Sequence, residues 1–354
     1  MERLDGITDP RHQGYVKYKS RVLLATRILS AIFYISSMRK TSEELNSQIA
    51  IENIGYLCGE ELDELPYWET VNNYLKRVKP EELQNTVCAL VKRLVRSRAF
   101  EDARIRGRYW HILIDGSGIV SSRKELDGNY IFKVHHRGKP EEYKEYAYYA
   151  LEAKLVLGNN IVVSIMTEFV ENADEEAKKQ DCERKACKRL MKRLKETFPK
   201  LPICIGADSL YACKPFFDDC KKDNWRYIVR FKEGSIPTVF QEYETLRELS
   251  VNRRKGTDGK ISYRYDFVSG IDYEGHKLNC LEYAEDGKAY PFMFLTNLPL
   301  SHRNAPETAF FGRRRWKIEN QGFNAQKNHG FALEHLFSRN YQAMKNHYYL
   351  IQIG

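Results

Sequence analysis

The hydrophobic pattern changes its period near residue 110, and this change constrains the fold more than any other feature of the sequence. Before it, apolar residues recur at helical spacing, as in 22–33 and 83–94. After it, short apolar runs of strand length begin at 111–114, and one long amphipathic stretch at 175–198 interrupts them. We therefore expect a helical N-terminal segment followed by a mixed α/β segment.

The order of these later elements narrows the fold class. It reads strand, strand, strand, helix, strand, helix, strand, which is the order of the RNase H-like fold. In that fold the first and fourth strands lie parallel at the sheet centre, where strands buried on both faces are continuously apolar. The expected strands are 111–114, 148–157, 160–169, 203–205 and 225–231, the turn between the second and third is at 158–159, and the helices are 175–198 and 214–222.

Residues 233–300 do not continue this alternation. Apolar runs there are separated by Gly and Asp turns, at 261–268, 277–283 and 291–295. We interpret them as a β-rich insertion, and the alternative is that they are extra strands of the main sheet. Helical spacing returns at 307–328. The predicted division is a helical domain at 1–107, a first part of the RNase H-like core at 108–232, the insertion at 233–300, and a second part of the core at 301–354.

The charge balance indicates a polyanionic partner. Lys and Arg number 57 against 48 Asp and Glu, a net charge of +9, which suits a nucleic acid or an anionic membrane surface. The membrane alternative is weak, because the apolar run 28–38 is shorter than the roughly 20 residues of a spanning helix. The first residues do not resemble a secretory leader, and none of the eight cysteines has Cys-x2-Cys spacing. We expect a cytoplasmic protein associated with the nucleoid, without a membrane partner.

Two carboxylates follow the strands that we expect to be neighbours. Asp115 comes directly after the run 111–114, and Asp208 follows 203–205 at a short distance. Each alone is also a common turn or cap residue. A charge at the end of a buried strand is costly unless it is paired or binds a cation. Together the two therefore favour a metal site at one edge of the sheet.

A third acid lies in a strongly basic helical stretch. Glu319 is surrounded by basic residues and, at about 100° per residue, shares a helix face with Arg315. The alternative is an ordinary surface pair between these two side chains. Packing neighbours at 316, 322 and 323 favour a closely approached face. The same face includes Gly322 and Gln326, and the other basic residues are Arg313, Arg314, Lys317 and Lys327.

These stretches together resemble insertion-sequence transposases of the DDE class, particularly those with a β-strand insertion before the last catalytic helix. That group has a Tyr-x2-Arg-x3-Glu-x6-Lys pattern, which Arg315 and Glu319 match. Gly312 stands at the Tyr position and Gln326 at the Lys position, with Lys327 one residue later. Stretches 179–183, 208–212 and 318–327 add to the likeness, which extends over about residues 8–340.

The resemblance implies an activity and a set of residue roles. Asp115, Asp208 and Glu319 would be catalytic and would bind two Mg²⁺ ions, for which Mn²⁺ would substitute, because carboxylates are hard oxygen ligands. The ions would promote cleavage at element ends and transfer of the freed 3′-hydroxyl into target DNA. Alternatives are a nuclease of the same fold without strand transfer and a silent DNA-binding descendant. The residues expected to hold DNA phosphates near the site are Arg315, Lys327, Arg313 and Arg314.

The N-terminal helices would recognise the terminal inverted repeats of the element. Helix 67–78 is the candidate for the major groove, because Asn and Arg make bidentate contacts with bases. The alternative is a support domain with solvated basic faces. Pairing of two DNA ends predicts a homodimer in the DNA complex. The candidate base-contacting residues are Asn72, Asn73, Lys76 and Arg77. The apolar run 348–353 ends one residue before the last, so the sequence leaves open whether a further segment follows.

Overall fold

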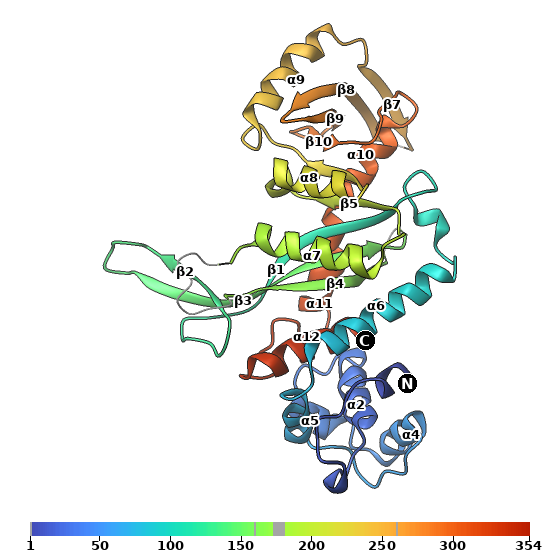
Figure 1. Ribbon diagram of the computed structural model, residues 1–354, viewed down its shortest axis with the longest axis vertical. Coiled ribbons are helices and arrows are strands. Elements are labelled where there is room, and N and C mark those ends of the chain that lie inside the picture. The colour runs from blue at the N-terminus through green and yellow to red at the C-terminus, as the bar shows by residue number, and fades with distance from the viewer. Residues whose placement is uncertain (1, 159–160, 173–180, 260) are drawn as a thin grey trace.

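The protein consists of a helical N-terminal region and one large sheet with helices packed on it. The computed structural model describes residues 2–158, 161–172, 181–259 and 261–354. The N-terminal helices lie at one end, the parallel strands lie in the middle, and the β-rich segment lies at the other end (Figure 1). This is a mixed α/β architecture of the RNase H-like class with a helical N-terminal region, as the sequence predicts.

Short helices form the N-terminal region up to residue 103. Pro80 begins the longest of them, because the first helical turn needs no donor from its nitrogen. Gly59 ends another at a φ of 63°, which glycine adopts without strain. The elements are α1 (Glu2–Asp5), η1 (Gln13–Tyr15), α2 (Ser20–Ile32), α3 (Met38–Glu44), α4 (Gln48–Cys58), α5 (Trp68–Leu75), α6 (Pro80–Arg96) and η2 (Glu101–Ala103).

A ten-stranded sheet forms the rest of the framework. Its order is β2-β3-β1-β5-β6-β10-β9-β8-β7. β4 pairs with the second half of β3, on the same edge whose first half pairs with β2. The strands are β1 (Trp110–Ser122), β2 (Ile131–His135), β3 (Tyr143–Val156), β4 (Val162–Val170), β5 (Ile203–Ala207), β6 (Arg226–Arg230), β7 (Arg254–Asp258), β8 (Ile261–Tyr273), β9 (His276–Glu285) and β10 (Phe292–Thr296).

The two strands expected at the centre of the sheet are neighbours. β1 and β5 pair in parallel from Trp110↔Ile203 to Leu113↔Gly206. β6 continues the parallel pairing on the far side of β5. All five residues of β5 are buried, as the continuous apolar run requires. The predicted parallel centre is therefore confirmed.

The β-rich segment continues the main sheet. β10 pairs antiparallel with β6, for example Leu295 with Val229, and β9, β8 and β7 follow edge to edge. In hydrogen bonding these are extra strands of the main sheet, the alternative considered above. A helix that we did not predict, α9 (Pro237–Leu249), precedes them and buries Val239 and Tyr243 against the sheet.

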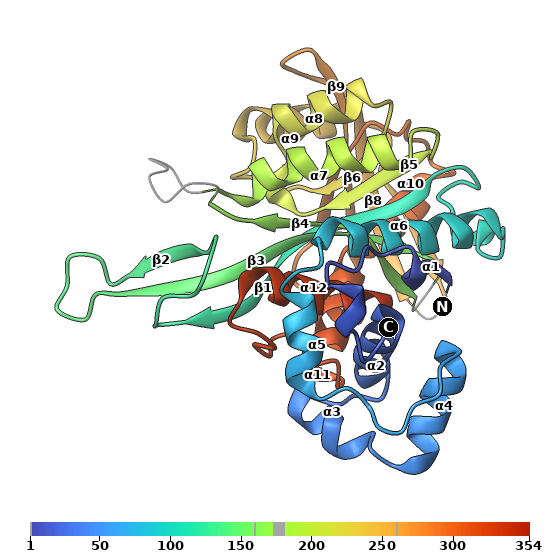
Figure 2. The same cartoon turned by 60° about the horizontal axis from the view of Figure 1, so that its bottom comes forward.

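A long hairpin projects from the body of the molecule. β2 pairs with the first half of β3, and together with the end of β1 they form an arm (Figure 2). His135 belongs to β2, and its Nε2 lies 2.7 Å from Oε2 of Glu145 on β3. His136 follows in the turn with a φ of 53°.

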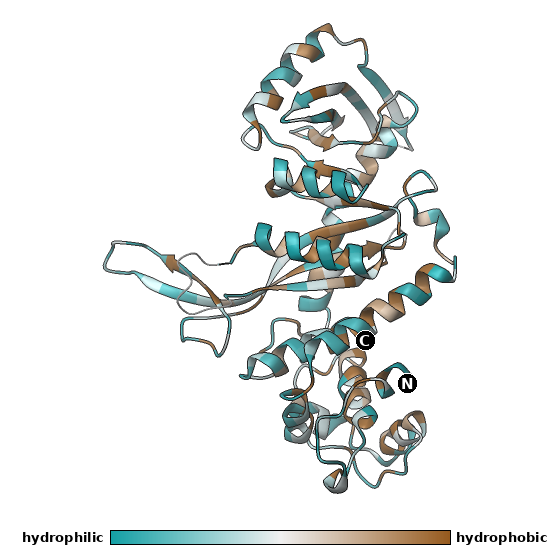
Figure 3. Cartoon of the chain, in the orientation of Figure 1, coloured by the Kyte–Doolittle hydropathy of each residue, from teal (hydrophilic) through white to brown (hydrophobic). Residues whose placement is uncertain are grey.

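Helices cover both faces of the sheet. α7 (Glu183–Thr197), α8 (Lys214–Lys222) and α9 pack on one face, while α2, α5 and α12 (Tyr341–Ile353) pack on the other, and α6 contributes residues to both clusters. Outward faces of α7 and α8 are largely hydrophilic, whereas the central strands are hydrophobic (Figure 3). Residues 175–180 of the expected helix 175–198, and Asn159 of the expected turn, lie outside the described residues. Within the described ranges, no helix has the length and apolarity needed to cross a bilayer.

The helix expected at 307–328 is divided into three successive segments. α10 (Ala305–Arg313) ends before Arg314, a π-helical turn, η4, spans Ile318–Phe323, and α11 spans Asn324–Asn328. A short 3-10 turn, η3 (Ser209–Tyr211), also follows β5. Wide helical turns of the π type are frequent at functional sites. The π-helical turn η4 contains Glu319.

Candidate active site

Asp115 lies within β1 rather than at its end. β1 continues to Ser122 because it stays paired with β3, whereas its pairing with β5 stops at Leu113↔Gly206. The expected strand end is therefore wrong for β1, but the parallel ladder does end two residues before Asp115. The side chain is only 16 % exposed.

Asp208 is the first residue after β5. Like Asp115, it lies two residues beyond the last β1–β5 pair, so the two acids stand at matching levels on neighbouring strands. Its Oδ1 accepts a hydrogen bond of 2.8 Å from the backbone nitrogen of Leu210, which caps η3. Asp208 thus caps the turn η3 and also lies beside β1.

Glu319 is connected to Asp115 through an arginine. Nη1 of Arg315 lies 2.7 Å from Oε1 of Glu319 and 3.1 Å from Oδ2 of Asp115. The surface pair considered as an alternative therefore exists, but the same guanidinium also reaches the buried acid of β1. Ile318 and Phe323 anchor η4 in the core on the sheet face that carries Leu113.

The rest of the expected helix face points elsewhere. Gly322 lies against Lys154 of β3, where an added Cβ would be 3.0 Å from the Cδ of that side chain. Gln326 accepts a hydrogen bond of 3.1 Å from Nζ of Lys154. Trp316, expected to be packed, is 57 % exposed. The π turn separates the acid-facing side chain of Glu319 from the core-facing positions that follow it.

Burial has the largest effect on the pKa of Asp115. Removal from water is the largest influence and raises the pKa of Asp115 to about 7, and the negative charge of Glu319 also raises it. Arg315 acts in the opposite direction by stabilising the carboxylate. The metal-free protein thus holds a partly protonated carboxyl next to a guanidinium at neutral pH.

The donor chemistry of this edge suits a hard divalent cation. Three carboxylates offer only oxygen ligands, as Mg²⁺ and Mn²⁺ prefer. Arg315 supplies positive charge between two of them, Asp115 and Glu319. Among the residues that the structure describes, no three His, Cys, Asp or Glu side chains are gathered closely enough to hold an ion. Binding of an ion by the three acids would therefore require Arg315 to move from between them.

The other basic residues of this stretch are engaged within the chain. Arg313 forms an ion pair with Glu285 of β9, and Nζ of Lys327 lies 2.7 Å from Oε1 of Glu334. Arg314 is 9 % exposed and stacks on Phe310 at 4.5 Å. Arg315, in contrast, contacts two of the acids, Asp115 and Glu319.

A cationic, aromatic hollow of about 490 Å³ borders this helix. Phe292, Phe310 and Trp316 form its apolar wall, and Lys288 and Lys317 add positive charge. Positive charge with aromatic faces is a combination that nucleic-acid surfaces use. The sequence does not predict this hollow, because its walls come together only where β10 packs beside α10.

Glu183 is an acid that is not among the predicted site residues. It begins α7 and accepts hydrogen bonds from two tyrosines, Tyr149 and Tyr211. Its negative charge is among the influences that raise the pKa of Asp115. Two sequence signals could have pointed to it: the stretch 179–183, which ends at Glu183, and the location of Tyr211 three residues after Asp208.

The candidate groove-binding residues lie on and just after α5. Asn73, Lys76 and Arg77 are exposed. Asn72 is half-buried, and its Oδ1 lies 3.4 Å from Nε2 of His347 on α12. The helix therefore offers three of the four predicted side chains to solvent.

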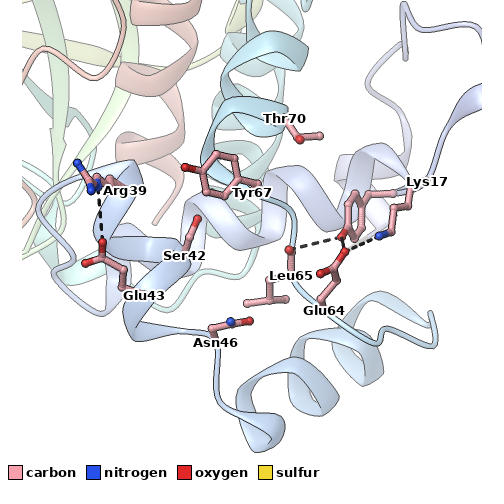
Figure 4. Close-up of a pocket in the computed structure, with 10 residues that line it drawn as sticks. Lys17, Arg39, Ser42, Glu43, Asn46, Glu64, Leu65, Tyr67 and Thr70 are labelled. Carbon is pink, nitrogen blue, oxygen red and sulfur yellow. Dashed lines mark hydrogen bonds and ion pairs between the residues drawn. The ribbon is translucent and has the colours of Figure 1, made fainter.

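A separate pocket of about 520 Å³ lies in the same helical region (Figure 4). Its cationic residues, Lys17 and Arg39, are paired with Glu64 and Glu43. These pairs leave little net positive charge for a phosphate, so the pocket is no part of the candidate active site.

The chain matches the model of a known protein family. The family model described as "Transposase DDE domain" matches residues 106–353, which include β1, β5 and η4. A comparison with curated proteins finds no match. The matched range covers well over half of the chain and all three acids. The chain therefore belongs to the DDE-domain transposase family.

Proposed function

We propose that the protein cuts DNA at the ends of a mobile element and joins the freed ends to target DNA, using divalent metal ions held by Asp115, Asp208 and Glu319. The observation that carries this proposal is the contact of Arg315 with both Asp115 and Glu319. It brings the helix of the third acid to the edge where β1 and β5 separate.

Each side chain has a separate task in this proposal. The carboxylates would bind the ions, which when bound activate the attacking oxygen and stabilise the leaving one. Arg315 would move from the acids to a phosphate next to the scissile bond, where its planar fork can bind two oxygens. Lys327 would reach the same strand after leaving Glu334.

The remaining regions would hold the DNA. We propose that residues 1–107 recognise the terminal repeats through Asn73, Lys76 and Arg77, with Asn72 supporting the helix from behind. Two copies would pair two element ends, and the protein would act on the nucleoid in the cytoplasm. Residues 108–232 and 301–354 would form the catalytic core, and the strands of 233–300 would extend its sheet.

The deciding experiment uses a duplex that carries the terminal repeat of the element, incubated with Mg²⁺. We expect wild type to nick and join it, and Glu319→Gln to bind it without either reaction. Glu242→Gln, which removes an exposed carboxylate from α9, is the matched control and should react like wild type.

Other outcomes would select other functions. Nicking without joined product would indicate a nuclease. Binding by wild type without any cleavage in Mg²⁺ or Mn²⁺ would indicate a silent descendant. Equal cleavage and joining by wild type and Glu319→Gln would show that the third acid has no catalytic role.

A further inference from the structure

The carboxylate of Glu183 accepts hydrogen bonds from two tyrosine hydroxyl groups in different parts of the fold. Tyr211 donates to Oε1 at 2.7 Å from η3, and Tyr149 donates to Oε2 at 3.2 Å from β3. Glu183 is the first residue of α7, and both of its oxygens are engaged. An acid in the first turn of a helix usually faces solvent and interacts with the helix dipole. Here it is turned toward the sheet.

Each tyrosine is located next to one of the strand acids. The ring of Tyr149 lies over Gly116, the residue after Asp115, and a Cβ at 116 would overlap the ring. Glycine at 116 is therefore what lets the tyrosine approach β1. Tyr211 belongs to the turn that Asp208 caps, and its backbone nitrogen donates to the carbonyl of Asp208 at 3.2 Å.

The two hydroxyl groups stay protonated and able to donate. Burial is the largest influence that raises the pKa of Tyr149, and the negative charges of Glu183, Asp115 and Asp208 add to it. Burial likewise raises the pKa of Tyr211, which is 1 % exposed. Two donors directed at one carboxylate form charge-assisted hydrogen bonds, which are stronger than neutral ones.

We propose that Glu183 is a positioning residue for the two strand acids. Through Tyr149 and Tyr211 it ties the strand of Asp115 to the turn of Asp208, across the point where β1 and β5 cease to pair. The brace sets the separation of the two carboxylates before an ion binds. This inference rests on the proposed function, because it assigns the brace a role in binding the catalytic ions.

The test measures ion binding without DNA. Free Mn²⁺ is followed by its electron paramagnetic resonance signal while it is titrated with wild type, Glu183→Ala, and Tyr149→Phe combined with Tyr211→Phe. Outer partners of metal ligands typically change affinity by about 10- to 100-fold. We expect both variants to weaken Mn²⁺ binding by that factor. Combining them should add little more, because both break the same brace.

Two further variants separate the brace from a general effect on α7. Glu183→Gln keeps one acceptor oxygen and should recover part of the affinity, and it serves as the test if Glu183→Ala does not fold. Glu196→Ala removes an acid from the far end of the same helix and should bind Mn²⁺ like wild type. Cleavage of the duplex should fall in parallel with Mn²⁺ affinity.

Three results would overturn the inference. Wild-type Mn²⁺ affinity in Glu183→Ala would show that the brace has no role at the ions. Normal binding by the double Phe variant beside weak binding by Glu183→Ala would show that Glu183 acts without the tyrosines. Wild type that neither binds Mn²⁺ nor cleaves DNA would refute the proposed function, and the inference with it. The first two leave the proposed function standing, because wild type still binds and cleaves.

Discussion

Nη1 of Arg315 lies 3.1 Å from Oδ2 of Asp115, although the two residues are 200 positions apart in the chain. This contact joins the helical stretch near the C-terminus to the central strand of the sheet. It also means that a positive charge already lies where the acids would hold a cation. A metal ion and Arg315 are therefore expected to compete for Asp115.

Replacing Arg315 should affect ion binding and catalysis in opposite directions. In Arg315→Ala we expect Mn²⁺ to bind about tenfold more tightly, because a competing cation is gone, a change of about 1.4 kcal/mol. DNA cleavage at saturating Mn²⁺ should fall, because the phosphate contact is lost. Arg315→Lys keeps the charge and should bind Mn²⁺ like wild type. Weaker Mn²⁺ binding by Arg315→Ala would contradict the competition.

The stability of the metal-free protein should decrease from pH 6 to pH 8 through Asp115. Its pKa of about 7 in the folded state lies above the ordinary 3.8, so the folded state holds the proton more tightly. The resulting stabilisation is complete below the ordinary pKa and is lost as pH rises through 7. Over these two units the loss is about 1 kcal/mol.

Urea unfolding at pH 6 and pH 8 measures this effect. Because other groups also titrate in this range, the quantity to compare is the change in unfolding free energy between the two pH values. Asp115→Asn should show a smaller decrease than wild type by about 1 kcal/mol. Equal decreases would show that Asp115 has no raised pKa.

Gly322→Ala should destabilise the protein and impair cleavage. The new Cβ would lie 3.0 Å from Cδ and 3.2 Å from Cε of Lys154, which is 1 % exposed and held by Gln326 and Gln352. Such overpacking typically costs about 1–3 kcal/mol. Thermal unfolding would measure the loss. Gly234→Ala, where a Cβ meets nothing within 4 Å, is the control and should change stability little. Unchanged stability in Gly322→Ala would show that Lys154 can move aside.

The parallel centre of the fold could be predicted because its signals are local. The two continuously apolar runs required burial on both faces, and β1 and β5 do pair in parallel. α8 was predicted with its observed bounds, since its apolar residues have helical spacing. α9 could also have been predicted, from Pro237 at its first turn and the spacing of Val239 and Tyr243.

Other elements left no such signal. β7 is a polar strand, Arg254–Asp258, that pairs with β8 at the edge of the sheet. β2 belongs to the projecting arm and has no buried face to impose alternation. At the candidate active site, the sequence predicted Asp115, Asp208 and Glu319 from three separate stretches. It could not show that Tyr149 reaches Glu183, because that contact depends on how β3 crosses α7.

Binding to DNA should depend on the exposed basic face of α7, which begins next to the acids. Arg184, Lys188 and Lys192 lie four residues apart on this face, roughly 6 Å per step along the helix. Replacing all three with Gln should reduce the slope of log affinity against log salt by about 2 to 3, at about 0.9 per phosphate contact.

Fluorescence anisotropy with a duplex at several salt concentrations gives this slope. The control changes the same number of charges at the far end of the sheet, at Arg254, Lys255 and Arg264, and should keep the wild-type slope. An unchanged slope in the α7 variant would exclude this face from the phosphate contacts.

The last helix of the chain, α12, is buried between the N-terminal helices and the sheet. Asn346 donates to the carbonyls of Leu75 and Val78, at the end of the candidate groove helix, at 2.8 Å each. On the other side, Gln352 accepts from Gln326 at 2.7 Å, close to the turn of Glu319. Through these hydrogen bonds α12 connects the part that would read the DNA directly to the part that would cut it. If the protein acts as proposed, the packing of α12 would set the number of base pairs between the recognised sequence and the broken bond, and repacking that helix would shift the cut.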